Sequence, residues 1–230
     1  MMEQNPTPFN IKGRTQYSTG LCARVLLTRG TFRETGSHQQ PVPGVWRKLT
    51  VMASRAELHS LPGVCTKPDA SASDFVMNHT MLRIKDPEKS LDFYTRILGM
   101  TLMTKLNLPV FETSLFLLGY EKLESVPDDE KERAAWTLGQ RGCIELSYSY
   151  GTDTDPEFKG YHDGNSEPRG FGHIGICVPN VEAACKRFEE LGVEFVKKPN
   201  DGKLKNVAFV KDPDGYWIEV LGTDVSNLFP

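Results

Sequence analysis

Residues 169–179 read RGFGHIGICVP, which sets a histidine into a strand punctuated by glycines. Because side chains alternate between the two faces of a strand, Ile174, Ile176 and Val178 share one face and His173 lies on the other. The histidine therefore faces away from the predicted apolar layer. A single histidine in such a place is usually an ordinary surface residue, but the chain contains the same arrangement twice.

The earlier copy of this arrangement is a predicted strand at residues 75–84. Its apolar residues alternate onto one face and leave His79 on the other. A helix follows, with Asp86 as its N-cap and Pro87 at its first position, and Gly99 ends it. This stretch therefore predicts one strand followed by one helix.

The two copies match in length. From His79 to Gly99 the span is 99 − 79 = 20 residues, and from His173 to Gly192, which ends the second helix, it is 192 − 173 = 19. Further strands are expected at residues 115–120, 143–148, 207–210 and 216–221. The tight-turn sequence DPDG joins the last two. We therefore predict an α+β fold of two βαβββ modules in one chain, at about residues 75–150 and 170–223.

The composition is that of an ordinary globular chain, with 230 residues, 39% hydrophobic and 25% charged. No run approaches the length of a membrane span, and a net charge of −3 creates no field that would recruit nucleic acid. We therefore expect small-molecule chemistry, with neither nucleic acid nor membrane as a partner. Five cysteines without a CxxC pair indicate reduced thiols: Cys22, Cys65, Cys143, Cys177 and Cys185.

The amino-terminal segment differs from the rest of the chain. Residues 1–55 carry eight basic residues against two acidic ones. An Arg-rich, acid-poor bias is typical of a mitochondrial or plastid transit peptide, and a disordered tail that targets nothing is the alternative. We expect residues 1–70 to be such an extension and residues 71–230 to hold the working domain. Translation from Met52 would give a cytosolic form.

Each module also carries a glutamate on its last predicted strand. Glu145 and Glu219 lie between apolar residues and therefore face the side opposite to them. One such glutamate is usually a solvent-facing residue, but each module offers one histidine and one glutamate. If these faces meet, imidazole nitrogen and carboxylate oxygen suit an open site for a divalent first-row metal. The predicted ligands are His79, Glu145, His173 and Glu219.

Five motifs then occur in order along the chain: HTMLR at 79–83, DPEKSLDFY at 86–94, LGM at 98–100, GFGHIG at 170–175 and DPDGYWIE at 212–219. Together they closely resemble glyoxalase I (lactoylglutathione lyase), of the vicinal-oxygen-chelate superfamily. The resemblance covers about residues 75–221 and implies the same four metal ligands. It implies isomerisation of the hemithioacetal of methylglyoxal and glutathione, as co-substrate, to S-lactoylglutathione through an enediolate.

The resemblance leaves the identity of the metal open. The eukaryotic zinc enzymes usually carry glutamine where this chain has His79, whereas the shorter nickel- or cobalt-activated bacterial enzymes carry histidine. Yet residues 121–140 form the longer insert of the zinc class. We favour zinc, and nickel or cobalt stay open, because an added imidazole strengthens binding of several late first-row metals.

The resemblance also implies roles for individual residues. A metal would disperse the enediolate charge as a Lewis acid, and Glu219 would be the base that moves the proton, with Glu145 its partner on the other face. The two carboxylates of glutathione would require cations nearby. The implied substrate contacts are Arg83, Ser149, Arg169, Lys197 and the backbone at Leu204, with Leu106, Leu108 and Leu117 as pocket candidates.

In this family the metal site lies between subunits, so the resemblance further implies a homodimer with two sites. Three alternatives stay open. Another metal-dependent enzyme of the superfamily, such as an epimerase of a coenzyme A thioester, would share fold and metal. A metal-free binding module would share the fold alone. Extradiol dioxygenases bind iron with two histidines and one carboxylate, and the second glutamate argues against them.

Overall fold

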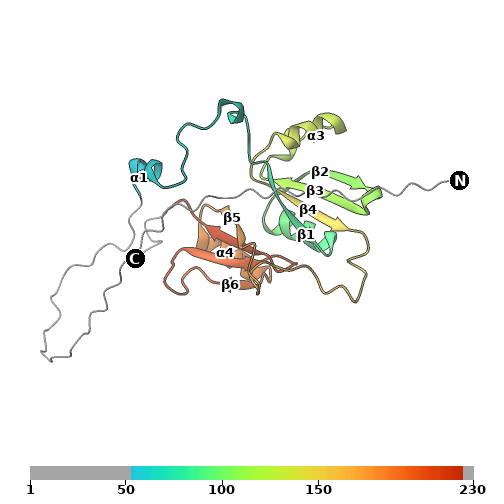
Figure 1. Cartoon of the computed structure of the whole chain (residues 1–230). Helices are drawn as coiled ribbons and strands as arrows, with labels where there is room; N and C mark the ends of the chain where they lie inside the picture. The colour runs from blue at the N-terminus through green and yellow to red at the C-terminus, as the bar shows by residue number, and fades with distance from the viewer. Residues whose placement is uncertain (1–52, 225–230) are drawn as a thin grey trace, which may run out of the picture. The chain divides into compact units, whose positions relative to one another are not determined.

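The computed structural model describes residues 53–224, which belong to one compact unit. Residues 1–52, the larger part of the predicted transit peptide, lie outside the described residues. The described part contains two four-stranded sheets, green to yellow and orange in Figure 1. This is the predicted α+β fold of two βαβββ modules. No described helix is long and apolar enough to cross a membrane.

The first module places its first and last strands side by side in the sheet order β1-β4-β3-β2, with β1 parallel to β4. Its elements are β1 (His79–Ile84), α2 (Pro87–Asp92), η2 (Phe93–Ile97), β2 (Thr101–Leu108), η3 (Pro109–Phe111), β3 (Thr113–Gly119), η4 (Leu123–Ser125), α3 (Glu130–Leu138) and β4 (Cys143–Ser149). The insert at residues 121–140 therefore contains α3.

The second module repeats this topology in the order β5-β8-β7-β6, with β5 parallel to β8. Its elements are β5 (His173–Cys177), α4 (Val181–Glu190), β6 (Phe195–Lys197), β7 (Val207–Lys211) and β8 (Trp217–Leu221). The strands that directly follow each helix, β2 and β6, had no separate sequence signal. The other six strands lie where the sequence predicts them, except that β1 begins at His79 and not at Phe75.

Capping side chains begin both main helices. Asp86 accepts the backbone N–H groups of Glu88 and Lys89, and Asn180 accepts that of Ala183, which satisfies donors that a helix start leaves unpaired. Asp86 is thus the predicted N-cap. The first helix continues past α2 as the π-helix η2, in which the N–H of Leu98 reaches the carbonyl of Phe93, a change of pitch that residue periodicity does not reveal.

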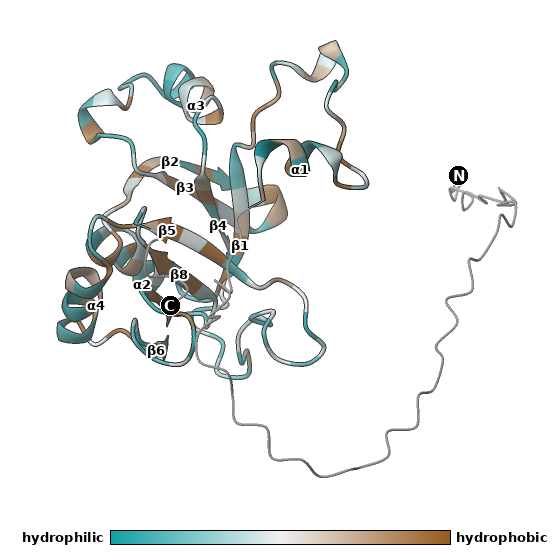
Figure 2. Cartoon of the chain, turned by 90° about the vertical axis from the view of Figure 1, so that its left-hand side faces the viewer, coloured by the Kyte–Doolittle hydropathy of each residue, from teal (hydrophilic) through white to brown (hydrophobic). Residues whose placement is uncertain are grey.

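The strands of both modules bury apolar side chains in one hydrophobic cluster. Leu82 and Ile84 of β1 contribute to it, as do Ile218 and Val220 of β8, and Figure 2 shows brown, hydrophobic stretches in the strands of both sheets. Each such side chain stabilises the fold by about 1.5–3 kcal/mol when fully buried. Leu191, by contrast, is exposed, because α4 ends before it and Leu191 is its C-cap.

Polar contacts also join the two modules, through residues 212–216, here called the inter-module turn. The hydroxyl of Tyr94 donates to Asp212 Oδ2 at 2.8 Å, and the backbone N–H of Lys85 donates to Asp214 Oδ1 at 2.8 Å. The hydroxyl of Tyr216 donates to the carbonyl of Arg83 at 3.1 Å. The predicted DPDG turn thus holds the second module against β1 and the helix of the first.

The segment before β1 is more regular than predicted. Within the predicted extension, residues 55–60 form helix α1, begun by a capping box between Ser54 and Glu57. A 3₁₀ helix, η1 (Ala70–Ala72), lies between α1 and β1. None of the residues of α1 is buried, so this helix rests on local capping rather than on packing.

The described cysteines are all free thiols. Cys143 and Cys185 are buried, and burial raises the pKa of Cys143 and raises that of Cys185 to about 11, which suits structural thiols. Cys65 and Cys177 are exposed. The expectation of reduced thiols agrees with all four, but only two of them lie in the core.

Candidate metal and substrate site

The first module brings its histidine and its glutamate together. Glu145 pairs across the parallel β1–β4 ladder with Met81, two residues after His79. The imidazole of His79 and the carboxylate of Glu145 therefore lie on the same face of the first sheet, and His79 Nε2 is 3.6 Å from Glu145 Oε2. Leu117 of β3 is the other cross-strand partner of Glu145, and it is buried there.

The second module repeats this geometry in the same register. Glu219 pairs with Gly175, two residues after His173, and His173 Nε2 is 3.4 Å from Glu219 Oε2. The predicted duplication is therefore present in side-chain positions as well as in sequence.

Each pair has the chemistry and spacing of two donors to one metal ion. Donors at about 2.1 Å from a shared ion lie about 3.0–3.4 Å apart for angles of about 90–109°. The two nitrogen–oxygen distances, 3.6 and 3.4 Å, are close to this range. Neutral imidazole and carboxylate are ligands of zinc and of other first-row metals.

The two pairs do not meet within one chain. Among residues 53–224 there is no group of three or more His, Cys, Asp or Glu side chains that could hold a metal ion. The conditional expectation that the two polar faces converge is therefore not met by a single copy. Each module presents two of the four predicted ligands.

Different neighbours hold the two histidine rings. His79 Nδ1 lies 2.6 Å from Oδ1 of Asn78, the residue directly before it. His173 instead stands edge-on to the ring of Phe209, with centroids 5.3 Å apart at 79°. Neither Asn78 nor Phe209 was among the residues predicted from the sequence to belong to the site. Asn78 had a signal, since it adjoins a predicted ligand, but its other partners lie about sixty residues away.

The expected substrate contacts are spread over both modules. Arg83 is exposed on the same face of β1 as His79, and Ser149 ends β4 on the face of Glu145. Arg169 is exposed and forms an ion pair with Glu167 at 3.0 Å.

The remaining two contacts lie in and after β6. Lys197 Nζ donates to the backbone carbonyls of Lys198 and Val207, and burial lowers the pKa of its ammonium group. Leu204 lies in the loop between β6 and β7. In this conformation the charge of Lys197 is therefore directed at backbone rather than at open solvent.

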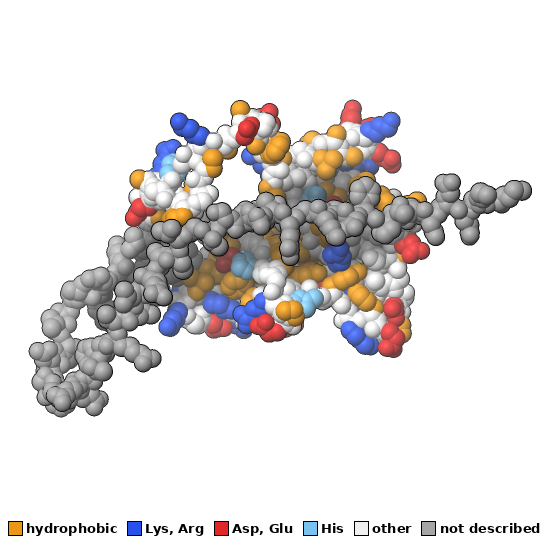
Figure 3. Space-filling view, viewed as in Figure 1, with side chains coloured by type: hydrophobic (Ala, Val, Ile, Leu, Met, Phe, Trp, Pro, Cys, Tyr) orange, Lys and Arg blue, Asp and Glu red, His pale blue; other side chains and the backbone are white. Residues whose placement is uncertain are grey.

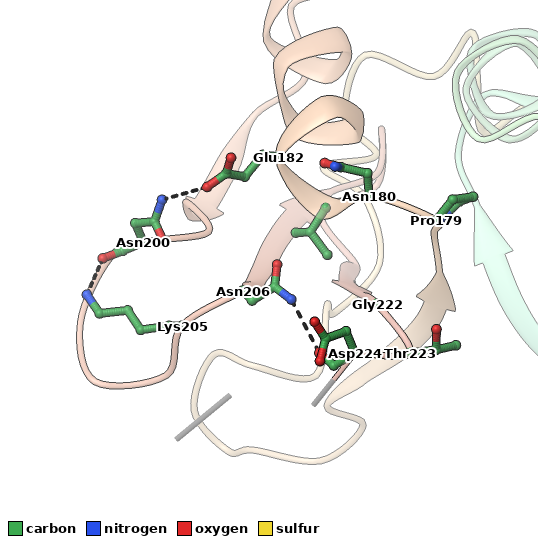
Figure 4. A pocket seen from close by; sticks show the side chains of 10 residues that line it. Pro179, Asn180, Glu182, Asn200, Lys205, Asn206, Gly222, Thr223 and Asp224 are labelled. Carbon is green, nitrogen blue, oxygen red and sulfur yellow. Dashed lines mark hydrogen bonds between the residues drawn. The ribbon is translucent and has the colours of Figure 1, made fainter. Parts of the chain in front are cut away.

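Two pockets differ in their relation to these residues. A pocket of about 600 Å³ is lined by His173, Gly175 and Cys177 of β5 together with Thr80 and Tyr120 of the first module. A polar pocket of about 470 Å³ at the start of α4 contains none of the expected ligands (Figure 4).

The side chains of that polar pocket bond mainly to one another. The amide of Asn200 donates to Glu182 at 3.3 Å, and Lys205 donates to the carbonyl of Asn200 (Figure 4). We therefore place the candidate site at the histidine–glutamate pairs, where the metal-binding chemistry is, and not at this pocket.

Comparisons with known proteins agree with the fold. Residues 76–220 match the model of the Glyoxalase/Bleomycin resistance protein/Dioxygenase superfamily. The chain is 51% identical over 166 residues to the lactoylglutathione lyase of Pseudomonas aeruginosa, covering 72% of this chain and 93% of that protein. It is 48% identical over 165 residues to the lactoylglutathione lyase of Pseudomonas putida, covering 72% and 95%.

Among solved structures, the trypanothione-dependent glyoxalase I of Leishmania major is 31% identical, covers 64% of this chain and 85% of that chain, and has a TM-score of 0.48. The family model spans 220 − 76 + 1 = 145 of the 230 residues. The chain therefore belongs to the Glyoxalase/Bleomycin resistance protein/Dioxygenase superfamily and, within it, to the lactoylglutathione lyases, the glyoxalase I enzymes.

Proposed function

We propose that this protein isomerises the hemithioacetal of methylglyoxal and glutathione to S-lactoylglutathione, and so detoxifies methylglyoxal. Membership of the lactoylglutathione lyases implies a divalent metal and a glutathione-derived substrate. The observation that carries the proposal for this chain is the pair of histidine–glutamate sets in identical register, one on each module.

The reaction moves a proton between two adjacent carbons, and Glu219 is our choice for the base. A bound metal would supply Lewis-acid stabilisation of the negative charge on the two substrate oxygens. Glu219 would take the proton from one carbon and return it to the next, for which it needs hydrogen-bond reach to both and freedom to loosen from the metal. Glu145 would remain the partner carboxylate on the other face.

We propose His79, Glu145, His173 and Glu219 as the ligands and zinc as the metal. Two imidazole nitrogens and two carboxylate oxygens do not by themselves select zinc over nickel or cobalt. The decisive experiment prepares metal-free protein and adds each of the three metals separately before assaying the hemithioacetal. Turnover restored by at least one metal supports both function and cofactor, and no turnover with any of them contradicts both.

The substrate carboxylates would bind at three cationic residues, Arg83, Arg169 and Lys197. Arg83 needs no rearrangement, because it is already exposed on the same face of β1 as His79. Arg169 would exchange its exposed partner Glu167 for a substrate carboxylate, and Lys197 would turn away from two backbone carbonyls. Ser149 and the backbone at Leu204 complete the proposed contacts.

We propose that a second copy completes each metal site. The shared core and the inter-module turn fix the two modules of one chain to each other, while their metal-binding pairs stay apart. A closed homodimer would place the first module of one chain beside the second module of the other, twice. Exposed apolar side chains on the first module are consistent with burial in such an interface: Phe75, Met77, Val110 and Phe111.

Mixing two inactive variants tests this arrangement. We combine His79→Ala protein with Glu219→Gln protein after reversible dissociation. If sites form between chains, the mixed dimer has one intact site, and activity returns to about a quarter of the wild-type value for random pairing. If each chain builds its own site, mixing restores nothing.

Localisation is a separate proposal. We propose that the basic amino-terminal segment directs the protein to a mitochondrion or plastid, and that a product starting at Met52 stays in the cytosol. Residues 1–52 fused to a fluorescent protein should enter the organelle; a diffuse cytosolic signal would contradict this.

A further inference from the structure

The side chain of Asn78 touches both the insert and an expected metal ligand. Its Nδ2 donates to the backbone carbonyls of Thr137 at 3.0 Å, Leu138 at 3.1 Å and Gln140 at 2.9 Å. These carbonyls lie at the carboxyl end of α3, where a helix leaves acceptors without partners. Asn78 therefore caps the end of a helix that lies 59 to 62 residues further along the chain.

These carbonyls fix which way the amide of Asn78 points. A carbonyl oxygen can only accept a hydrogen bond, so the NH₂ group must face the helix and Oδ1 must face the other way. Asn78 Oδ1 lies 2.6 Å from His79 Nδ1. Since Oδ1 is only an acceptor, the ring nitrogen must be the donor.

The proton position of His79 follows from this. In the neutral ring, a proton on Nδ1 leaves the lone pair on Nε2. That nitrogen is the one 3.6 Å from Glu145 Oε2. The ring therefore directs the lone pair of Nε2, which can bind a metal, toward the expected metal position. In metal sites the second nitrogen of a ligating histidine is commonly held by such a hydrogen bond, and its loss typically costs 10- to 100-fold in affinity or activity, as an order of magnitude.

We propose that Asn78 is a positioning residue through which the carboxyl end of α3 sets the tautomer and the orientation of His79 for metal binding. This rests on the proposed function insofar as His79 is taken as a metal ligand. The insert then belongs to the metal site of the first module, although none of the four proposed ligands lies in it. Its charged side chains face outward at the upper right of Figure 3, and its contribution comes from its backbone.

The second module cannot use the same device. The residue before His173 is Gly172, which has no side chain to cap a helix or to accept from a ring. Within the described part of the chain, no side chain forms a hydrogen bond with Nδ1 of His173. The ring of His173 packs against Phe209 instead. The inference therefore predicts an effect at one histidine only, which makes it specific.

The first measurement is made on the wild-type protein and needs a variant only for assignment. Metal-free protein labelled with ¹⁵N-histidine carries five histidines, and the resonances of His79 are assigned by comparison with the His79→Gln protein. Long-range ¹H–¹⁵N correlations at a pH where the ring is neutral should show the proton on Nδ1. A proton on Nε2 of His79 would overturn the inference directly.

The second measurement compares Asn78→Ala with Thr137→Val. The backbone carbonyl of Asn78 accepts from the N–H of Cys143 at 2.9 Å, so the strand end stays anchored when only the side chain is removed. We expect Asn78→Ala to lose the single tautomer of His79 and to weaken zinc binding about 10- to 100-fold in a chelator competition. Thr137→Val alters the same helix end but keeps its carbonyls, and should bind zinc as the wild type does.

The outcomes separate this inference from the proposed function. An Asn78→Ala protein with unchanged tautomer and zinc affinity within about twofold of wild type would refute the positioning role. An equal loss in Thr137→Val would assign the effect to a general loosening of α3 and would refute it as well. Wild-type protein that shows the Nδ1 tautomer yet isomerises no hemithioacetal would contradict the proposed function alone, because neither measurement contains substrate.

Discussion

The two modules use the same connection, between their third and fourth strands, for different purposes. In the first module it is the long insert, and α3 within it caps onto Asn78 beside His79. In the second it is the inter-module turn, in which Asp212 and Asp214 accept hydrogen bonds from the first module. The two modules thus share the same strand register, while the loops between their third and fourth strands differ in role. The first loop contacts the residue that positions His79, and the second loop binds the two modules to each other.

The two histidine–glutamate pairs also differ in how exposed their side chains are. The side chains of His79 and Glu145 are 31% and 16% exposed, whereas those of His173 and Glu219 are 42% and 24% exposed. The first pair is therefore the more enclosed, and one of its members is hydrogen-bonded to a neighbour. This favours Glu219, in the more open pair, as the carboxylate that moves during the reaction.

The largest expected effect comes from removing one carboxylate charge in each module in turn. Glu219→Gln should lower kcat by about 10²- to 10⁴-fold, because a positioned base contributes a factor of this size. Glu145→Gln should mainly weaken metal binding and recover part of its kcat at saturating metal. Steady-state kinetics on both variants over a range of zinc concentrations distinguish these results, and the reverse pattern would assign the base to Glu145.

A second variant makes the open pair resemble the enclosed one. The position beside Glu145 is occupied by Met81, and that beside Glu219 by Gly175. A Cβ at Gly175 would already lie 3.6 Å from Glu219 Oε2 and 3.5 Å from Leu221 Cδ2, which is ordinary contact. A longer side chain would therefore fill the space into which Glu219 would move.

We expect Gly175→Met to lower kcat about tenfold through misplacement of the base. Zinc affinity should change much less, because the nitrogen and oxygen donors stay. Gly175→Ala, which only reaches ordinary contact, is the matched control and should stay near the wild-type kcat. Unchanged kcat in Gly175→Met would show that Glu219 needs no such space.

Much of this comparison could be predicted from sequence, for a physical reason. Alternation along a strand and repetition of a strand–helix unit are local properties, so they placed His79 and Glu145, and later His173 and Glu219, on matching faces. The N-cap at Asp86 and the turn at DPDG are equally local.

What the sequence could not predict are the contacts made across long stretches of chain. The partners of Asn78 lie about sixty residues away and those of Asp212 and Asp214 more than a hundred. They are set by how α3 and the two modules pack, which no periodicity encodes. The four expected ligands were placed in two pairs, but whether another copy brings the pairs together is likewise beyond one sequence.

The inter-module turn should give the fold a dependence on pH that the insert does not. Burial, as the largest cause, raises the pKa of Asp212 to about 7, and Asp214 nearby adds to it. Hydrogen bonds from Tyr94 and from the backbone of Tyr216 and Asp214 oppose the shift. Around Asp214, whose own pKa burial also raises, stand the charges of Lys85 and Asp86.

The sign follows from proton binding. Between about pH 4, the pKa of an unfolded aspartate, and about pH 7 the folded protein holds a proton on Asp212 that the unfolded chain has released. Stability from this group is therefore present below about pH 4 and falls as the pH rises through this window. Above it, folded and unfolded chains both carry the charge.

Asp212→Asn removes this titration. The asparagine can keep its oxygen toward the backbone N–H groups of Asp214 and Tyr216, and its NH₂ can donate to the hydroxyl of Tyr94. Urea unfolding at several pH values should show wild type losing stability relative to the variant from about pH 4 to about pH 7 and a constant difference above. A pH-independent difference would mean that Asp212 is not protonated in the folded protein.

The smallest expected effect is a change in the free energy of unfolding when Thr137, in the insert, is replaced. Within residues 53–224, the hydroxyl of Thr137 is the one buried side-chain polar atom without a hydrogen-bond partner, although the backbone carbonyl of the same residue accepts from Asn78. Thr137→Val keeps the shape and the helix propensity and removes the unpaired group, which should raise the free energy of unfolding by about 1 kcal/mol. Chemical unfolding measures this directly. A loss of about 1 kcal/mol or more would instead mean that a partner, such as a water molecule, satisfies the hydroxyl in solution.

The same variant compares the insert with the inter-module turn. Because Thr137→Val keeps the backbone carbonyl, a more stable α3 should hold Asn78 and His79 as before. A gain in stability without a change in zinc affinity would show that α3 acts on His79 through its backbone, whereas the inter-module turn acts through its carboxylates.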